Sequence, residues 1–210
     1  MKKILHRVIG SSSSSSDDID CGFQDIPPVD FTTPTTQETV DFKNSVAKYK
    51  IIIVGDSGVG KTSLIESFKN KNFQLHTSPT MGVDFSVRDL KLDNGDTVNL
   101  RIFDSAGQSI FREILKPDVQ GVVVVYDITD SSSFDSCAKW IETAREHSPE
   151  NVKISLTGNK SDLDSSREVT YYQGRDFAEQ RDVNFTEVSA KTIANVDKLF
   201  VELVKRIHIK

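Results

Sequence analysis

The chain has 210 residues, with 31 acidic residues against 26 Lys and Arg residues, and a formal net charge of −5 at pH 7. This acidic balance argues against a general nucleic-acid-binding protein, and no apolar run approaches the roughly 20 residues needed to span a bilayer. The two cysteines, Cys21 and Cys137, stand far apart, which argues against a disulfide framework or a zinc site and favours a reducing compartment.

Residues 1–47 have the composition of an N-terminal extension rather than of a folded core. A serine run at 11–16 precedes acidic residues and prolines, and apolar residues are sparse. Such a segment cannot bury enough surface to offset its ordering entropy, so we expect disorder. The alternatives are a phosphorylatable or partner-binding arm and an organelle transit peptide. His6 and Arg7 interrupt the first apolar segment, so we expect no signal peptide.

Residues 48–210 are expected to form one folded domain. They open with a β-branched run at 49–54, which predicts a buried strand. The next eight residues, from Gly55 to Thr62, read Gly-Asp-Ser-Gly-Val-Gly-Lys-Thr, and 63–68 has the pattern of a helix start. The motif G-x-x-x-x-G-K-[ST] between a strand and a helix is typical of a phosphate-binding loop; the alternative is a glycine-rich turn that contains a stray lysine.

In such a loop, glycines let the backbone bend around a phosphate, and successive backbone N–H groups at a helix N-terminus face the anion. Lys61 can reach the β and γ phosphates, and the Thr62 hydroxyl can ligate Mg²⁺. We therefore predict phosphate contacts from Ser57, Gly58, Val59, Gly60, Lys61, Thr62 and Ser63.

The rest of the chain alternates strands and helices. Further strands are predicted at 83–92, 97–103, 121–126, 152–157 and 184–188, and helices at 134–146, 171–181 and 195–207. Asn94-Gly95 predicts an antiparallel hairpin between the first two of these strands, because this pair tolerates positive φ at both central positions. The fold class is therefore α/β: a doubly wound, mostly parallel sheet of about six strands with helices on both faces.

Core positions follow from apolar continuity in strands and from helical spacing. Residues 121–126 are continuously apolar, so that strand should be central and covered on both faces. For the two amphipathic helices, the spacing predicts core contacts by Phe134, Cys137, Ala138 and Ile141, and by Val196, Leu199, Phe200 and Val204. Trp140 is expected to be a helix-packing aromatic.

A second polar stretch, Asp104-Ser105-Ala106-Gly107-Gln108, follows the strand that ends at 103. In doubly wound sheets, ligands bind beyond the carboxyl ends of the strands. There Asp104 can hold Mg²⁺ directly or through water, the Gly107 N–H can meet a γ-phosphate, and Gln108 can orient a water for attack. The alternative is a polar turn.

Two more stretches follow later strands and suit a guanine base. In Asn159-Lys160-Ser161-Asp162, the Asp162 carboxylate can accept from the guanine N1–H and amino group, which adenine cannot match, and the Lys160 stem can cover the base. In Ser189-Ala190-Lys191, the Ala190 N–H can meet the guanine oxygen. Each stretch alone also reads as an ordinary polar loop.

Taken in this order, the four stretches resemble the Ras superfamily of small GTPases. The resemblance covers about residues 49 to 208 and is strongest to the Rab branch, through Gly82-Val83-Asp84-Phe85, Tyr126-Asp127-Ile128-Thr129, Gly158-Asn159-Lys160-Ser161-Asp162-Leu163 and Val188-Ser189-Ala190-Lys191-Thr192. It implies the P-loop GTPase fold, GTP and GDP binding with Mg²⁺, and slow GTP hydrolysis. It also implies the partners of a trafficking switch: effectors, an exchange factor and a GTPase-activating protein. It also implies a monomer in the cytoplasm, held peripherally at endomembranes by partners.

The family pattern assigns two further residues. Phe73 falls where an aromatic ring packs edge-on against guanine; the alternative is a core phenylalanine. Thr80 matches the threonine of the first switch, whose hydroxyl ligates Mg²⁺ and whose N–H senses the γ-phosphate, so loss of that phosphate would release the loop. The residues implied in catalysis are Lys61, Thr80 and Gln108.

The chain departs from the Rab pattern in three places. Ser109-Ile110 replaces the usual Glu-Arg after the glutamine, and the stretch 111–126 is a few residues short. Pro117 should end the helix of the second switch early. The chain ends at Lys210 without a C-terminal cysteine, so we expect no prenyl anchor.

The altered second switch leaves one rival function open: a nucleotide-dependent interaction module with little or no hydrolysis. A P-loop kinase acting on a small acceptor is a second rival. It would prefer ATP, and the guanine-type loop around Asp162 argues against it.

Overall fold

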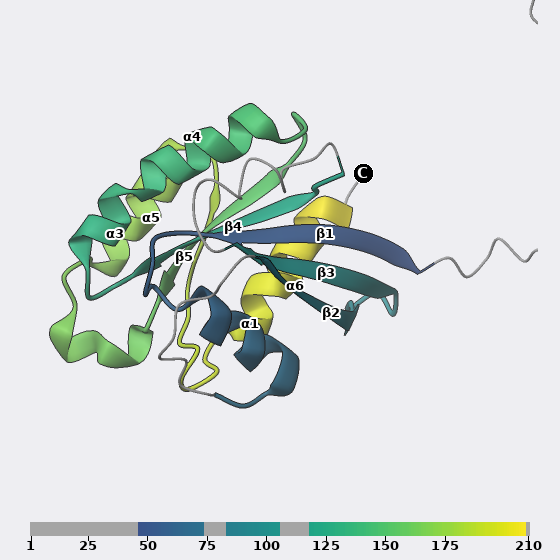
Figure 1. Cartoon of the computed structure of the whole chain (residues 1–210), viewed down its shortest axis with the longest axis horizontal. Coiled ribbons are helices and arrows are strands. Elements are labelled where there is room, and N and C mark those ends of the chain that lie inside the picture. The colour runs from purple at the N-terminus through teal and green to yellow at the C-terminus, as the bar shows by residue number, and fades with distance from the viewer. Residues whose placement is uncertain (1–45, 74–82, 106–117, 209–210) are drawn as a thin grey trace, which may run out of the picture. The chain divides into compact units, whose positions relative to one another are not determined.

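A six-stranded sheet forms the centre of the described part of the chain (Figure 1). The computed structural model describes residues 46–73, 83–105 and 118–208. The strands are β1 Ala47–Val54, β2 Val83–Lys91, β3 Thr97–Ser105, β4 Gly121–Asp127, β5 Lys153–Asn159 and β6 Asn184–Glu187. The helices are α1 Lys61–Asn70, α3 Ser131–Asp135, α4 Cys137–His147, α5 Tyr171–Gln180 and α6 Val196–His208, with a 3₁₀ helix at Ser161–Ser166.

The sheet order is β2-β3-β1-β4-β5-β6. Only the β2–β3 pair is antiparallel; β1, β3, β4, β5 and β6 run parallel to one another. Because the parallel strands end at the same edge, their following loops meet there. The predicted fold class is confirmed.

Two apolar layers cover the two faces of the sheet. Figure 1 shows α1 and α6 on one face and α3, α4 and α5 on the other. β4 is buried at every position and serves both layers, since Val123 and Val125 pack with the α1–α6 side while Val122 and Val124 pack with the α4–α5 side. The prediction of a central, doubly covered strand is confirmed. Among the described residues, no helix is long and apolar enough to cross a membrane.

The hairpin between β2 and β3 forms as predicted, but its turn differs. The pair Asn94-Gly95 was interpreted as tolerating positive φ at both residues, but of the two only Gly95 has a positive φ (89°). The Gly95 N–H donates to the Leu92 carbonyl (3.0 Å), and the Leu92 N–H donates to the Asp96 carbonyl (2.8 Å). This is a three-residue connection with glycine in the left-handed position. The Asn94 side chain, which accepts from the Asp96 N–H (3.1 Å), favours this form.

The helix predicted at 134–146 is two helices that meet at Ser136. Phe134 therefore lies on the short α3, where its ring packs 4.9 Å from the ring of Tyr126. On α4 the buried stripe is Cys137, Trp140, Ile141 and Ala144, so Ala138, only partly buried, was wrongly placed in the core. The spacing i, i+3, i+4, i+7 of these four residues is that of one helix face. The predicted core contacts of α6 are all confirmed.

Candidate nucleotide site

The phosphate loop lies between the carboxyl end of β1 and the start of α1. Gly60 precedes the helix with φ 93° and ψ 29°, a conformation that a side chain would strain. A Cβ on Gly60 would also lie 2.5 Å from the Asn159 side-chain nitrogen. The backbone N–H groups of the first helical turn, beginning at Lys61, have no acceptor within the helix. These N–H groups are hydrogen-bond donors at a helix N-terminus, where an anion can bind.

Lys61 points back into the loop. Its ammonium donates to the carbonyls of Gly55 (2.9 Å) and Asp56 (2.8 Å). Burial lowers the pKa of Lys61, and the carboxylates of Asp104 and Asp56 oppose that shift. A phosphate near the ammonium would add negative charge that favours its protonated form.

Thr62 and Asp104 bring oxygen atoms together beside the loop. The Thr62 hydroxyl donates to Asp104 Oδ2 at 2.5 Å, and Asp104, at the end of β3, is only 2% exposed. Among the residues described, no cluster of three or more His, Cys, Asp or Glu side chains could hold a metal ion. This pair fits Mg²⁺ nonetheless, because Mg²⁺ typically takes one or two carboxylates together with phosphate oxygens and water.

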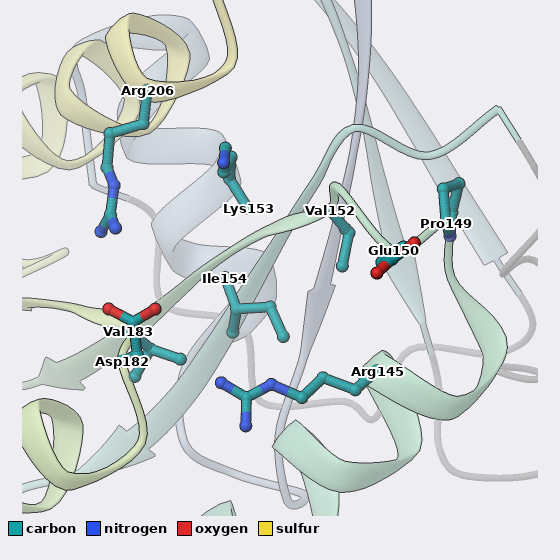
Figure 2. A pocket seen from close by; sticks show the side chains of 9 residues that line it. All are labelled: Arg145, Pro149, Glu150, Val152, Lys153, Ile154, Asp182, Val183 and Arg206. Atoms are coloured by element: carbon teal, nitrogen blue, oxygen red, sulfur yellow. The ribbon is translucent and has the colours of Figure 1, made fainter.

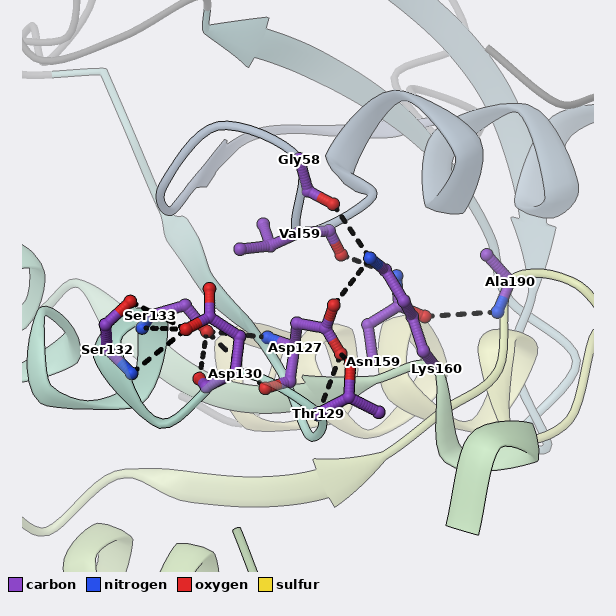
Figure 3. Close-up of polar contacts among 10 residues, drawn as sticks. All are labelled: Gly58, Val59, Asp127, Thr129, Asp130, Ser132, Ser133, Asn159, Lys160 and Ala190. Carbon is purple, nitrogen blue, oxygen red and sulfur yellow. Dashed lines mark hydrogen bonds and ion pairs between the residues drawn. The ribbon is translucent and has the colours of Figure 1, made fainter. Parts of the chain in front are cut away.

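Asn159 joins three segments of the site (Figure 3). This side chain, 1% exposed at the end of β5, donates from Nδ2 to the Val59 carbonyl (2.9 Å). Its Oδ1 accepts from the Ala190 N–H (3.1 Å). One amide therefore links the phosphate loop, β5 and the loop after β6. The Ala190 N–H, predicted to meet a guanine oxygen, has Asn159 as its partner in this structure.

Lys160 also reaches the phosphate loop. Its ammonium donates to the Gly58 carbonyl (2.9 Å) and pairs with Asp127 Oδ2 at 2.5 Å. The side chain is therefore stretched from β5 toward the loop, with its alkyl stem along the site, as Figure 3 shows.

The remaining residues predicted to contact the base also lie together. Asp162 Oδ1 accepts from the Ser189 hydroxyl (2.5 Å), and Lys191 Nζ lies 4.0 Å from Asp162 Oδ2. Phe73 is half-buried against the core layer beneath α1 and α6, which fits the alternative of a core phenylalanine. Thr80, Gly107 and Gln108 lie outside the described residues.

Two residues of the site were given no role by the sequence. The indole N–H of Trp140, predicted only to pack, donates to Asp56 Oδ1 in the phosphate loop (2.9 Å). Asp127, at the end of β4, pairs with Lys160. Asp127 follows a buried strand, as the other site residues do, and that position was the signal available for finding it. No local pattern points to the Trp140 contact.

A cavity of about 360 Å³ lies at the opposite edge of the sheet, around the amino end of β5 (Figure 2). Its lining combines basic and acidic side chains: Arg145, Lys153 and Arg206 with Glu150 and Asp182. None of the predicted site residues lines it.

Comparison with known proteins agrees with this geometry. A model of the Ras family matches residues 50–209. The Ras-related protein RabC of Dictyostelium discoideum is 44% identical over 164 residues, which cover 76% of this chain and 84% of the relative. The chain is therefore a Rab-like small GTPase of the Ras family.

Proposed function

We propose that the chain is a molecular switch that binds GTP and GDP with Mg²⁺, hydrolyses GTP slowly and regulates intracellular vesicle or membrane trafficking. The observation that carries this proposal is the convergence on Asn159, whose side chain bonds both the phosphate loop at Val59 and the base-side loop at Ala190. Such a link would hold a phosphate-binding loop and a base-binding loop in fixed relation to each other.

The proposed roles follow from position. Lys61 and the amides of the loop and first helical turn, from Ser57 to Ser63, hold the phosphates. Asp162 accepts hydrogen bonds from guanine, with Lys160 along the base and Ser189, Ala190 and Lys191 lining the opposite side. Phe73 would pack edge-on against the guanine ring.

Mg²⁺, when bound, would supply positive charge that offsets the negative charge of the phosphates. Thr62 and Asp104 would hold it, together with Thr80 from the first switch. Gln108 would orient the attacking water, and the Gly107 N–H would meet the γ-phosphate. Catalysis would then consist of positioning and electrostatic stabilisation.

Effectors, an exchange factor and a GTPase-activating protein would bind through the two switch segments. The exposed ring of Phe85, 49% accessible and 4.9 Å from the ring of Phe103, supports an apolar contact surface on β2. Such partners would hold the protein at endomembranes. In this proposal the folded domain runs over 48–210 and follows an extension at 1–47.

Single-turnover hydrolysis tests the proposal. The full chain, loaded with GTP or ATP and Mg²⁺, is compared with Gln108→Leu and with Gln180→Leu, a matched change at an exposed position of α5. We expect slow turnover of GTP only, lost in Gln108→Leu and kept in Gln180→Leu. Tight GTP binding without turnover in any variant would support the interaction module instead. Preference for ATP would overturn the guanine assignment.

A further inference from the structure

Both carboxylate oxygens of Asp127 have partners. One accepts hydrogen bonds from Thr129 in the turn that follows β4, and the other contacts Lys160. Oδ1 accepts from the Thr129 N–H (2.9 Å) and the Thr129 hydroxyl (2.7 Å), while Oδ2 pairs with Lys160 Nζ. The Asp127 N–H in turn donates to the Ser133 hydroxyl (3.0 Å). The residue is 6% exposed, so its carboxylate has a fixed orientation.

We propose that Asp127 is a positioning residue that holds Lys160 against the phosphate loop and so slows the release of guanine nucleotide. The inference deepens the proposed function and rests on it. The sequence placed Asp127 in the stretch Tyr126-Asp127-Ile128-Thr129 but gave it no role.

The contacts of Lys160 show what the carboxylate supports. The ammonium lies between Asp127 Oδ2 (2.5 Å) and the Gly58 carbonyl (2.9 Å), so one cation connects the end of β4 to the phosphate loop. Lys160 also holds a φ of 65°, which is uncommon for a residue with a side chain and which the surroundings must impose. A long, flexible side chain loses rotamer freedom when it is fixed. The carboxylate, only 9% exposed, is the charged group that offsets this loss.

A purely structural carboxylate stands three residues further along the chain for comparison. Asp130 accepts from the N–H groups of Ser132 (3.1 Å) and Ser133 (3.4 Å) at the start of α3. The side-chain hydrogen bond from Ser132 is the main cause that lowers the pKa of Asp130, and the charge of Lys160 is the last of its causes. No ion pair joins Asp130 to Lys160 within the described ranges. Asp130 therefore carries the same charge as Asp127 but lacks its ion pair with Lys160, which makes it the control position.

Removal of the Asp127 charge should free the lysine. Asp127→Asn keeps the size of the side chain and an oxygen for Thr129, but it turns an NH2 donor toward the Lys160 ammonium in place of the carboxylate oxygen, so the ion pair is lost. A hydrogen bond between charged groups is stronger than one between neutral groups, but the partial exposure of this pair reduces its contribution. We therefore expect release of GDP about tenfold faster than in the wild type.

The test measures release of fluorescent GDP from the full chain in Mg²⁺, for the wild type, Asp127→Asn, Asp130→Asn, Lys160→Met and the Asp127→Asn/Lys160→Met double variant. We expect Asp127→Asn to accelerate release about tenfold and Asp130→Asn less than about twofold. The double variant should release GDP no faster than Lys160→Met alone, because Asp127 acts through that lysine. A carboxylate with a merely structural role would instead give losses that add.

Unchanged release from Asp127→Asn, or additive effects in the double variant, would overturn the inference. If Asp127→Asn does not fold, Asp127→Glu replaces it in the same comparison. This variant keeps the charge but moves it, so release should change in the wild-type background and not in the Lys160→Met background. An equal change in both backgrounds would also overturn it. Failure of the proposed function looks different, since the wild type itself would then retain no guanine nucleotide.

Discussion

The indole N–H of Trp140 donates a hydrogen bond of 2.9 Å to the carboxylate of Asp56, and so ties α4 to the phosphate loop. Trp140 is 4% exposed, and the backbone carbonyl of Asp56 accepts from Lys61. Asp56 therefore contacts Lys61 through its backbone and α4 through its side chain.

Trp140→Phe should therefore weaken nucleotide retention while keeping most of the packing. Loss of a hydrogen bond to a charged group costs about 1.5–3 kcal/mol, so GDP release should accelerate about tenfold or more. The measurement is fluorescent-GDP release in the wild-type and Asp56→Ala backgrounds. If the hydrogen bond carries the effect, Trp140→Phe adds little in Asp56→Ala; an equal acceleration in both would mean that packing alone is responsible.

Gly60→Ala and Gly95→Ala form a matched pair. Both positions have φ near 90°, so each substitution strains the backbone by about 1–2 kcal/mol. A Cβ at Gly95 meets nothing within 4 Å, whereas one at Gly60 would lie 2.5 Å from Asn159. We expect both variants to lose stability in urea unfolding, and only Gly60→Ala to lose GDP affinity in titration. Equal GDP affinities would show that Asn159 can move without harm to the site.

Asp162→Asn should lower GTP affinity about tenfold or more, because guanine would lose a charged acceptor for its N–H groups. Asp164→Asn is the control, since Asp164 has a 79% exposed side chain that pairs with Arg167. Equilibrium titration of both variants with GTP decides the matter. An unchanged affinity of Asp162→Asn would remove the basis for guanine selectivity.

Cys137 should be unreactive in the folded protein. Burial raises the pKa of this thiol to about 12, and the thiolate is the form that alkylating reagents attack. Iodoacetamide at pH 8 should modify Cys137 only after unfolding in urea, as peptide mass spectrometry would report. Labelling at the same rate with and without urea would contradict the burial.

The same raised pKa predicts a pH dependence of stability. The folded state keeps the thiol protonated while the unfolded state can ionise, so the contribution is complete below the usual thiol pKa. It is lost as the pH rises from there toward about 12. The free energy of unfolding should fall over this range in the wild type more than in Cys137→Ala, measured by urea denaturation at each pH.

Local patterns were sufficient for the strands, the helix of the phosphate loop and the place where the site forms. A glycine-rich motif after a β-branched strand predicts its own geometry, and parallel strands bring their carboxyl ends together, so Asp104, Asn159 and Asp162 could be assigned to one site. The contact of Lys160 with the Gly58 carbonyl could not be predicted in this way, because it depends on how close the two loops lie in the folded chain.

Individual side-chain contacts account for two of the features that the sequence did not reveal. The Trp140 indole finds its acceptor in another element, and no spacing along the chain encodes that pairing. The Asn94-Gly95 turn was decided by a side chain, since Asn94 bonds Asp96 and only Gly95 adopts positive φ. The break at Ser136 divides a continuous helical pattern into α3 and α4.

Under the proposed function, the shared amide of Asn159 would couple the binding of the base to the binding of the phosphates. Its two hydrogen bonds, to Val59 and to Ala190, belong to loops on either side of the nucleotide site. Displacement of one loop would pull on the Asn159 side chain and weaken its bond to the other loop, so we expect contacts to the base and to the phosphates to weaken together. A protein that catalyses exchange would then need to pull on a single loop to empty the whole site.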